Sequence, residues 1–317
     1  MNYLGLDIGG TAIKIGLIDP QGNILCNTSF PVAFDNYQTP LMETALQGIQ
    51  LFLSENHLSS ADIRGIGVSA TGQIDSATGT VVGTTGYIPH WIDTPIQEIL
   101  QKKYGLPVRV INDANSVALA EQWIGAAAGF SDVIAVTIGT GVGGGVIIDS
   151  DLLTGSRGIA GELGHFPIQA GGTVCSCGNS GCYEYYASTT ALIRMVREQY
   201  DSLSLAIPAQ EIDGRFIFRM AQSGHAGICH ILDEWIGYVA AGLIGLTHIF
   251  NPQLILIGGG VCLQDTLFIS PLREKVLQHV MPQFSKGLQL KAASLGNNAG
   301  MIGAVRYFMQ TEAVGKC

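Results

Sequence analysis

Two segments far apart in the chain share one pattern, in which two apolar runs flank a glycine-rich reversal. Residues 6–19 can be laid over residues 136–149, and Ile8 then falls on Ile138. Each copy predicts a strand, a turn and a second strand. Because a repeated supersecondary unit implies a chain of two similar halves, this feature constrains the fold more than any other. The alternative is a chance likeness between two short glycine hairpins.

Helix and strand patterns alternate along both halves, which is typical of mostly parallel sheets covered by helices. The expected helices are 40–52, 114–128, 235–250 and 299–309, and the expected strands are 63–69, 108–111, 253–257 and 282–294. No Ser- or Pro-rich linker separates the halves, which suggests a hinge. We place the N-terminal domain at residues 1–117 plus 299–317 and the C-terminal domain at residues 118–298.

The composition supports a large buried core. Of the 317 residues, 47% are hydrophobic and 13% are charged, against about 25% charged in ordinary globular chains. The formal net charge of -9 would repel the phosphate backbone of a nucleic acid. We therefore expect no nucleic-acid partner.

Neither residues 1–7 nor the longest apolar run of the chain predicts export or a membrane span. Residues 1–7 lack the basic and apolar stretches of a signal peptide, and the seven cysteines are an odd number. Residues 235–264 carry no Asp, Glu, Lys or Arg, but Asn251-Pro252 and the glycines at 258–260 interrupt them. We predict a buried helix and a buried strand there, no membrane span, and a reducing, cytoplasmic setting.

The first glycine reversal has the residues of a phosphate site. Asp7 ends a strand, Gly9 and Gly10 form the reversal, and Thr11 and Lys14 follow. Glycines let backbone N–H groups approach a phosphate closely, Thr11 adds a hydroxyl donor, and Lys14 adds a cation. A carboxylate such as that of Asp7 can hold Mg2+, commonly through water. A plain tight turn would also use glycine, so that alternative stays open.

The second reversal, residues 139–145, repeats this arrangement in the opposite half. Two facing phosphate cradles suit a triphosphate better than one, which indicates nucleotide binding. A third glycine turn, residues 258–260, follows an apolar strand at a place where a flat adenosine could rest. Taken alone, this third turn is equally compatible with a plain reversal.

Four metal-ligating side chains gather in one glycine-rich stretch, namely His165, Cys175, Cys177 and Cys182. Three thiolates and one imidazole make a closed tetrahedral zinc site, which leaves no coordination position for water. The metal should therefore be structural, and it should hold the flanking Glu162 and Glu184 in place. The alternatives are a redox cluster or a coincidence, and for the two glutamates an exposed surface position.

Asn112 and Asp113 follow a predicted strand directly and form the candidate catalytic pair. An acid at the end of a parallel strand faces the ligand crevice of an open α/β sheet and can accept a proton from an alcohol. Capping of the next helix would explain the same residues. The two phosphate cradles and the metal-braced carboxylates favour phosphoryl transfer to a polyhydroxy substrate.

These residues resemble the ROK family of repressors, open reading frames and sugar kinases, within the actin-like ATPase superfamily. The likeness extends over essentially the whole chain. Residues 6–11 look like the family's first phosphate motif, residues 139–145 like its second, and residues 162–165 like its sugar-binding stretch. Residues 175–184, which read Cys-Ser-Cys-Gly-Asn-Ser-Gly-Cys-Tyr-Glu, reproduce its zinc signature in full, and that motif is highly specific.

The resemblance implies an α/β fold of two actin-like, ribonuclease H-like domains with an interdomain cleft. It also implies an ATP-dependent kinase that phosphorylates a hexose or hexose derivative at the 6-hydroxyl, with Asp113 as general base. The implied substrate contacts are Gly72, Asn112, Asp113, Glu162, His165 and Glu184. The implied contacts to ATP and Mg2+ are Asp7, Gly9, Gly10, Thr11, Lys14, Gly139, Thr140, Gly141, Gly143, Gly259 and Gly260. The implied ligands of a structural Zn2+ are His165, Cys175, Cys177 and Cys182.

Two departures from the family leave the sugar open. Before the loop at Gly72 the family usually has Pro or Ala-Gly, whereas this chain reads Ala70-Thr71-Gly72. Tyr87-Ile88-Pro89-His90-Trp91 stands where it usually has Asn-Leu-Pro-Gly-Trp, the stretch that closes over the substrate. Glucose, N-acetylmannosamine, another N-acetylhexosamine and a β-glucoside are all compatible with these residues.

The same residues also bear on other functions and on the expected partners. The alternatives are a non-catalytic sugar-sensing protein and an actin-like ATPase without a sugar substrate. Only six residues precede Asp7, so we do not expect a DNA-binding repressor. The expected partners are a small-molecule sugar, ATP and a second copy of the chain, since a homodimer is the common default.

Overall fold

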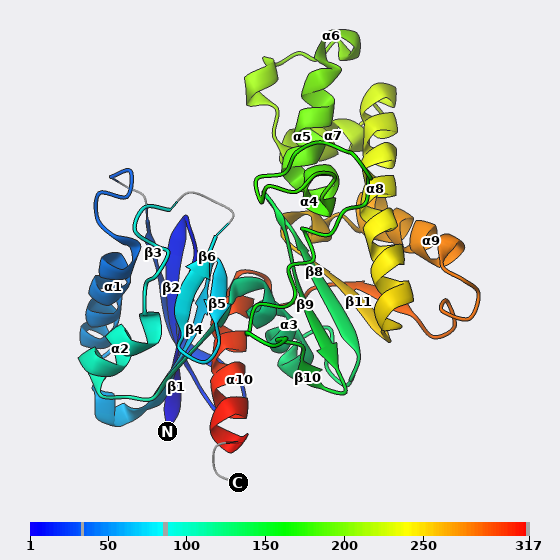
Figure 1. Ribbon diagram of the computed structural model, residues 1–317. Helices are drawn as coiled ribbons and strands as arrows, with labels where there is room; N and C mark the ends of the chain where they lie inside the picture. Colours follow the sequence, from blue (N-terminus) through cyan, green and yellow to red (C-terminus); the bar gives the residue numbers. More distant parts are fainter. Residues whose placement is uncertain (33–34, 85–87, 315–317) are drawn as a thin grey trace. The chain divides into compact units, whose positions relative to one another are not determined.

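The computed structural model describes residues 1–32, 35–84 and 88–314 (Figure 1). Its backbone passes more than once between two compact units. The first unit consists of Met1–Gly129, Leu152–Gly161 and Leu295–Cys317, and the second of Phe130–Asp151 and Glu162–Ser294.

A five-stranded sheet organises the first unit in the order β3-β2-β1-β4-β7, beside a small two-stranded sheet, β5-β6. Strands β1, β2 and β3 pair antiparallel, whereas β4 and β7 extend the sheet in parallel on the other side of β1. The elements are β1 (Asn2–Ile8), β2 (Ala12–Ile18), β3 (Ile24–Pro31), α1 (Leu41–Glu55), β4 (Ile63–Ala70), β5 (Gln73–Asp75), β6 (Thr80–Gly83), α2 (Ile96–Tyr104), β7 (Val108–Asn112), α3 (Asp113–Ile124) and α10 (Ala299–Val314).

Helix α10 packs closely on this sheet because two glycines of β4 leave room for it. A Cβ at Gly67 would lie 2.3 Å from the Ala304 carbonyl oxygen, and one at Gly65 would lie 2.1 Å from the Phe308 ring. Phe308 and Tyr3 belong to one buried cluster, in which their ring centroids are 5.7 Å apart. The last described helix, α10, thus packs on the sheet to which the first strand, β1, belongs.

A second five-stranded sheet organises the second unit in the order β10-β9-β8-β11-β12. Strand β9 pairs antiparallel with β8, and β11 and β12 follow in parallel. The elements are β8 (Val133–Ile138), β9 (Val142–Ile148), β10 (Asp151–Leu152), α4 (Tyr183–Ala187), α5 (Thr189–Glu198), α6 (Tyr200–Leu203), α7 (Gly214–Gln222), α8 (Ala226–Phe250), β11 (Leu254–Gly258), α9 (Ser270–His279) and β12 (Gln289–Ala292).

The repeat expected from the sequence is confirmed by these two sheets, which have the same strand order. Strands β1 and β2 correspond to β8 and β9. Ile8 pairs with Ile13 around the first reversal, whereas Ile138 pairs with Val142 around the second, which is shorter by one residue. The glycines at 143–145 consequently lie inside β9, and only residues 139–141 make the turn.

Several expected boundaries differ from those of the structure. The first unit extends to Gly129, takes up the chain again at Leu152–Gly161, and resumes at Leu295, whereas the expected boundary after residue 117 would cut the continuous helix α3. The helix expected at 114–128 ends at Ile124, where the Glu121 carboxylate accepts a 2.8 Å hydrogen bond from the Ala126 N–H. The strand expected at 282–294 is only Gln289–Ala292, because turns precede it.

Helix α8 is longer than expected, since it begins at Ala226 rather than at residue 235. By length and composition alone it could cross a membrane. Half of its most apolar window is buried inside the protein, and Trp235, Val239 and Leu243 are fully buried. These contacts are those of a core helix of the second unit.

Candidate functional site

Asp7 lies at the end of β1 and is held by two donors of the first unit. Its Oδ2 forms a 2.9 Å ion pair with the Lys14 ammonium of β2, and its Oδ1 accepts a 2.9 Å hydrogen bond from the Ser69 hydroxyl of β4. A Cβ at Gly300 would lie 2.5 Å from the Asp7 carboxyl carbon, so α10 also closes on this side chain. Sequence reasoning missed Ser69, a small polar residue in an apolar strand run.

The first glycine turn presents unpaired backbone donors. The Gly9 N–H donates to the Ala12 carbonyl at 3.1 Å, and the Tyr37 hydroxyl donates to the Gly10 carbonyl. Among the residues that the structure describes, none accepts a hydrogen bond from the N–H groups of Gly10 and Thr11. An anion is the ligand that such successive N–H groups bind.

Asn112 and Asp113 stand where β7 passes into α3, and they have different structural roles. Asn112 is the cap of α3, because its Oδ1 accepts hydrogen bonds from the N–H groups of Ala114 and Asn115. Its amide donates to the Gly72 carbonyl at 2.9 Å and to Asp113 Oδ1 at 3.0 Å. Capping therefore explains Asn112, whereas Asp113 is the first helical residue, and its Oδ1 accepts both the Asn112 amide and, at 2.8 Å, the Ala114 N–H.

The two stretches that depart from the family lie against each other. The Trp91 indole N–H donates a 2.9 Å hydrogen bond to the Thr71 carbonyl, and Trp91 is buried. Gly72 has a φ of 101°, and a Cβ there would lie 2.6 Å from the Gly83 carbonyl oxygen, so this position requires glycine. Tyr87 lies outside the described residues.

The second glycine turn is anchored by its carbonyl groups. The Thr189 N–H donates to the Gly139 carbonyl at 2.9 Å, and the Thr190 hydroxyl donates to the Thr140 carbonyl at 2.7 Å. Within the described part of the chain, no group accepts from the N–H of Thr140 or of Gly141. As in the first turn, the free donors suit an anion.

The expected sugar stretch, residues 162–165, packs on the strand that leaves this turn. A Cβ at Gly164 would lie 2.2 Å from the Val142 carbonyl oxygen, and one at Gly144 would lie 2.4 Å from the Leu163 side chain. Glu162 is exposed and His165 is half-buried. Glycine is thus needed at both contacts for the backbones to approach.

Glu184, the first-turn acid of α4, reaches the same turn. Its Oε2 accepts a 2.9 Å hydrogen bond from the Val142 N–H. Its backbone N–H donates to the Gly164 carbonyl at 2.8 Å. The structure therefore joins Glu184, the second glycine turn and the stretch 162–165 in one cluster of the second unit.

The third glycine turn lies beside the second. Gly258 pairs with Thr137 at the end of β8. Gly259 has a φ of 91°, and a Cβ there would lie 2.0 Å from the Ile138 carbonyl oxygen. Gly260, which begins a short 3-10 helix, has open space where a side chain would start.

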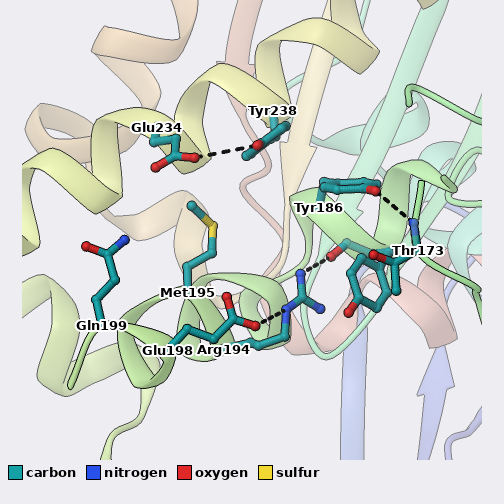
Figure 2. Close-up of a pocket in the computed structure, with 9 residues that line it drawn as sticks. Thr173, Tyr186, Arg194, Met195, Glu198, Gln199, Glu234 and Tyr238 are labelled. Carbon is teal, nitrogen blue, oxygen red and sulfur yellow. Dashed lines mark hydrogen bonds and ion pairs between the residues drawn. The ribbon is translucent and has the colours of Figure 1, made fainter. Parts of the chain in front are cut away.

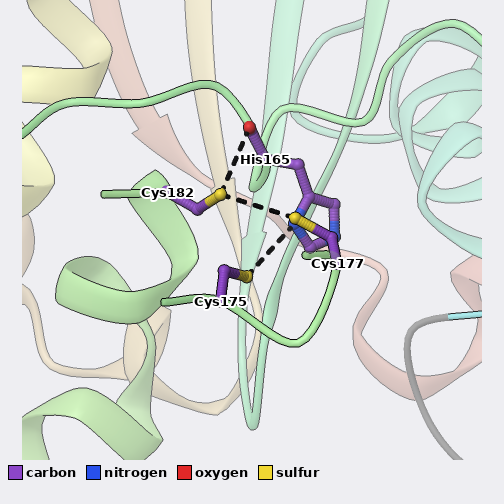
Figure 3. Close-up of side chains that lie close together, drawn as sticks. All are labelled: His165, Cys175, Cys177 and Cys182. Atoms are coloured by element: carbon purple, nitrogen blue, oxygen red, sulfur yellow. Dashed lines mark hydrogen bonds between the residues drawn. The ribbon is translucent and has the colours of Figure 1, made fainter. Parts of the chain in front are cut away.

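The expected metal ligands converge, as Figure 3 shows. One ligand atom from each of His165, Cys175, Cys177 and Cys182 lies within 4.8 Å of all the others. The Cys177 and Cys182 sulfurs are 3.6 Å apart, and the Cys175 sulfur is 3.7 Å from His165 Nδ1. These separations fit one tetrahedral ion with bonds of about 2.0 to 2.3 Å.

As free thiols, the cysteines of this cluster differ in acidity. Burial, together with the hydrogen bond to Cys177, raises the pKa of Cys182 to about 12. The backbone N–H of Asn179 holds the pKa of Cys177 below its usual range. Because a metal binds thiolates, its binding would release protons from this cluster.

Tyr183, between the last cysteine and Glu184, fixes this segment to the core. Its hydroxyl donates a 2.8 Å hydrogen bond to the Val239 carbonyl of α8, and burial raises its pKa. A Cβ at Gly242 would lie 2.3 Å from the Tyr183 ring. The position of Glu184 is therefore set by packing on α8 as well as by the cluster.

A pocket of about 250 Å³ lies elsewhere in the second unit and contains none of the expected site residues (Figure 2). Its charged groups are paired within the pocket. Arg194 lies 3.7 Å above the Tyr185 ring and 3.5 Å from Glu198, and Glu234 accepts from the Tyr238 hydroxyl at 3.5 Å.

The expected site residues thus form two groups, one in each unit. Asp7, Gly9, Gly10, Thr11, Lys14, Gly72, Asn112 and Asp113 belong to the first unit. Gly139, Thr140, Gly141, Gly143, Glu162, His165, Cys175, Cys177, Cys182, Glu184, Gly259 and Gly260 belong to the second.

Known proteins resemble this chain over nearly its whole length. The model of the ROK family matches residues 3–311. A glucokinase of Thermotoga maritima is 34% identical over 96% of each chain, and a beta-glucoside kinase of Listeria monocytogenes is 34% identical over 98% of this chain and 99% of its own. The crystal structure of a ROK family glucokinase from Streptomyces griseus, in complex with glucose and AMPPNP, has a TM-score of 0.83 and 30% identity, with 98% of this chain and 100% of that one covered.

Proposed function

The chain belongs to the ROK family, and from this membership we propose that it is an ATP-dependent kinase of a hexose or hexose derivative. The actin-like α/β fold and the full-length similarity to glucokinases support the class of reaction. Glucose and N-acetylmannosamine are the substrates we favour, with transfer to the 6-hydroxyl.

The observation that carries the proposal is the shared geometry of the two glycine turns. In each, the first glycine N–H is used inside the turn, and the next two N–H groups have no acceptor among the described residues. Successive backbone N–H groups of this kind bind phosphate oxygens without adding a charged side chain. Each of the two turns thus offers backbone donors that suit a phosphate group of ATP.

We assign Asp113 the role of general base. Its carboxylate would accept the proton of the sugar 6-hydroxyl as that oxygen attacks the γ-phosphorus in line. The bond from the γ-phosphorus to the bridging oxygen breaks, and ADP leaves with that oxygen. Asn112 would orient the base, since its amide donates to Asp113 Oδ1.

Asp7 is the residue that would hold Mg2+, through water. The ion, when bound, offsets negative charge on the ATP phosphates. The Ser69 hydroxyl and the Lys14 ammonium orient the Asp7 carboxylate from two sides, which supports this role. Gly72, Glu162, His165 and Glu184 are the sugar contacts we propose, together with Asn112 and Asp113.

The donor set of the cluster fits a structural Zn2+, held by His165, Cys175, Cys177 and Cys182. With four protein ligands, the ion would stabilise the folded loop. It would have no coordination position for a reactive water. Its part in the function would be to fix the segments that carry Glu162 and Glu184.

A coupled ADP-release assay over a panel of sugars tests the proposal. Glucose, N-acetylmannosamine, N-acetylglucosamine and a β-glucoside are each added to enzyme, ATP and Mg2+. We expect ADP to form only with one or more sugars present. An ATP hydrolysis rate that is the same with and without every sugar would contradict a kinase and favour an ATPase without a sugar substrate. Binding of a sugar without ADP release would favour the non-catalytic sensor.

The remaining expectations concern the setting of the enzyme. We propose that it acts in the cytoplasm, where thiolates of the metal cluster stay reduced. We also propose a homodimer, which sedimentation of the purified protein would test. The net charge of -9 supports small-molecule partners rather than nucleic acid.

A further inference from the structure

One carboxylate links the segment after the metal cluster to the second glycine turn. Glu184 Oε2 accepts the Val142 N–H at 2.9 Å. A Cβ at Gly141 would lie only 2.3 Å from that same oxygen, so the carboxylate fills the space beside the turn. A residue that we expect to contact sugar therefore touches the turn that we expect to bind phosphate.

The backbone that carries Glu184 is itself fixed. Its N–H donates to the Gly164 carbonyl at 2.8 Å, and the neighbouring Tyr183 hydroxyl donates to the Val239 carbonyl at 2.8 Å. The carboxylate thus cannot leave Val142 by a shift of α4 without breaking these contacts. The half-buried side chain is then held at the turn by its hydrogen bond to Val142.

The other supports of the turn come from the same short segment. The Thr189 N–H holds the Gly139 carbonyl, and the Thr190 hydroxyl holds the Thr140 carbonyl. Glu184 is the member that accepts a hydrogen bond, and the two threonines are the members that donate. Together they hold three successive peptide groups: the two that carry the N–H groups of Thr140 and Gly141, and the next one, which carries the Val142 N–H.

We propose that Glu184 is a positioning residue for nucleotide, which orients the turn 139–141 for a phosphate through the Val142 N–H. The inference rests on the proposed kinase function, and it gives Glu184 a role in nucleotide binding in addition to its proposed contact with sugar. Because coupling between two ligands is reciprocal, sugar bound at Glu184 would change nucleotide affinity, and nucleotide would change sugar affinity by the same factor.

The charge of Glu184 and its hydrogen bond have opposite expected effects on nucleotide affinity. Two substitutions can therefore distinguish them. A carboxylate near the turn repels phosphate, so its charge alone would weaken nucleotide binding. Its hydrogen bond to Val142 would strengthen binding by holding the turn. Glu184→Ala removes both the hydrogen bond and the charge, whereas Glu184→Gln keeps an oxygen acceptor and removes only the charge, so the difference between the two variants reports the hydrogen bond.

The test measures the dissociation constant of magnesium ADP by calorimetry in the absence of sugar. We expect Glu184→Ala to weaken binding about tenfold, the size of one hydrogen bond to a charged group, and Glu184→Gln to restore most of the loss. Sugar affinity should fall in both variants. Glu198→Ala is the matched control, because that carboxylate of α5 is 65% exposed and does not contact the turn.

Hydrogen exchange gives a second readout that needs no ligand. The Val142 amide should exchange faster in Glu184→Ala than in the wild type and in Glu198→Ala. Should Glu184→Ala fail to fold, Gly141→Ala serves instead, because its added Cβ would push the carboxylate away from Val142 while its charge remains.

Each outcome bears on one claim. Weaker ADP binding with rescue by glutamine supports the positioning role. Equal ADP dissociation constants in the wild type and Glu184→Ala, with only sugar affinity reduced, would overturn it and leave the kinase function standing. A wild type that binds no nucleotide would overturn the proposed function itself.

Discussion

The Leu295 N–H donates a 2.7 Å hydrogen bond to Oε1 of Glu121, a residue that precedes it by 174 positions. The other carboxylate oxygen of Glu121 accepts the Ala126 N–H at 2.8 Å. Glu121 is fully buried. The Glu121 side chain therefore binds two backbone segments of the first unit, one at Ala126 and one at Leu295. The first lies shortly before the unit boundary at Gly129, and the second lies at the boundary at Leu295.

Glu121→Gln should lower the free energy of unfolding by about 1 to 3 kcal/mol, because the buried amide offers one acceptor oxygen where the N–H groups of Ala126 and Leu295 need one each. Urea unfolding, followed by circular dichroism, measures the change. Glu274→Gln, an exposed glutamate of α9, is the control and should stay within about 0.5 kcal/mol of the wild type. Equal midpoints for both variants would show that the two hydrogen bonds of Glu121 do not stabilise the fold.

Asp113→Asn should reduce kcat by about 100 to 10,000-fold, the usual range for loss of a general base, while the melting temperature changes little. Steady-state kinetics with the best sugar of the panel measure it. Asp201→Asn, an exposed position on α6, controls for the charge change. Turnover like that of the wild type would remove Asp113 from the mechanism.

Ser69→Ala should raise the Mg2+ concentration needed for half-maximal rate by about fivefold, because the Asp7 carboxylate loses one of its two oriented donors. A magnesium titration at saturating ATP and sugar measures this, and the sugar KM should not change. Ser29→Ala, on the exposed edge of β3, is the matched control. If the magnesium dependence is unchanged, Ser69 does not contribute to Mg2+ binding by Asp7.

Protein purified without added metal should carry about one equivalent of zinc per chain, and Cys182→Ser should lose most of it. The sugar KM should rise in that variant, since Glu162, His165 and Glu184 lose a common support. Elemental analysis and steady-state kinetics measure the two effects. Cys229→Ser, in α8 and outside the cluster, should keep its zinc; a metal-free wild type would contradict the site.

Much of the fold was accessible from local patterns. The repeat of apolar runs around glycines predicted the paired sheets, because each run needs a neighbour and a helix to cover it. The cysteine spacing predicted the convergence of four ligands, since glycines at 178 and 181 with φ values of 89° and 79° bend the loop. These features depend on residues close together in sequence.

The rest depends on partners that no local pattern reveals. The end of α3 was expected four residues late because alanines at 126–128 favour helix, whereas the Glu121 side chain competes for the Ala126 N–H. Ser69 is a polar residue at a strand end, but its contact with Asp7 requires the pairing of β1 with β4. Glu184 is adjacent to a cysteine, and only the tertiary structure brings it to Val142.

Helix α10 and strand β1 come from opposite ends of the described chain, yet β4 admits α10 at two glycines and Asp7 lies against Gly300. During synthesis on the ribosome, the first sheet is therefore made long before the helix that shields it. Until α10 has been synthesised, the apolar face of the sheet that α10 covers stays exposed. Chaperones can bind this face, and it can promote aggregation.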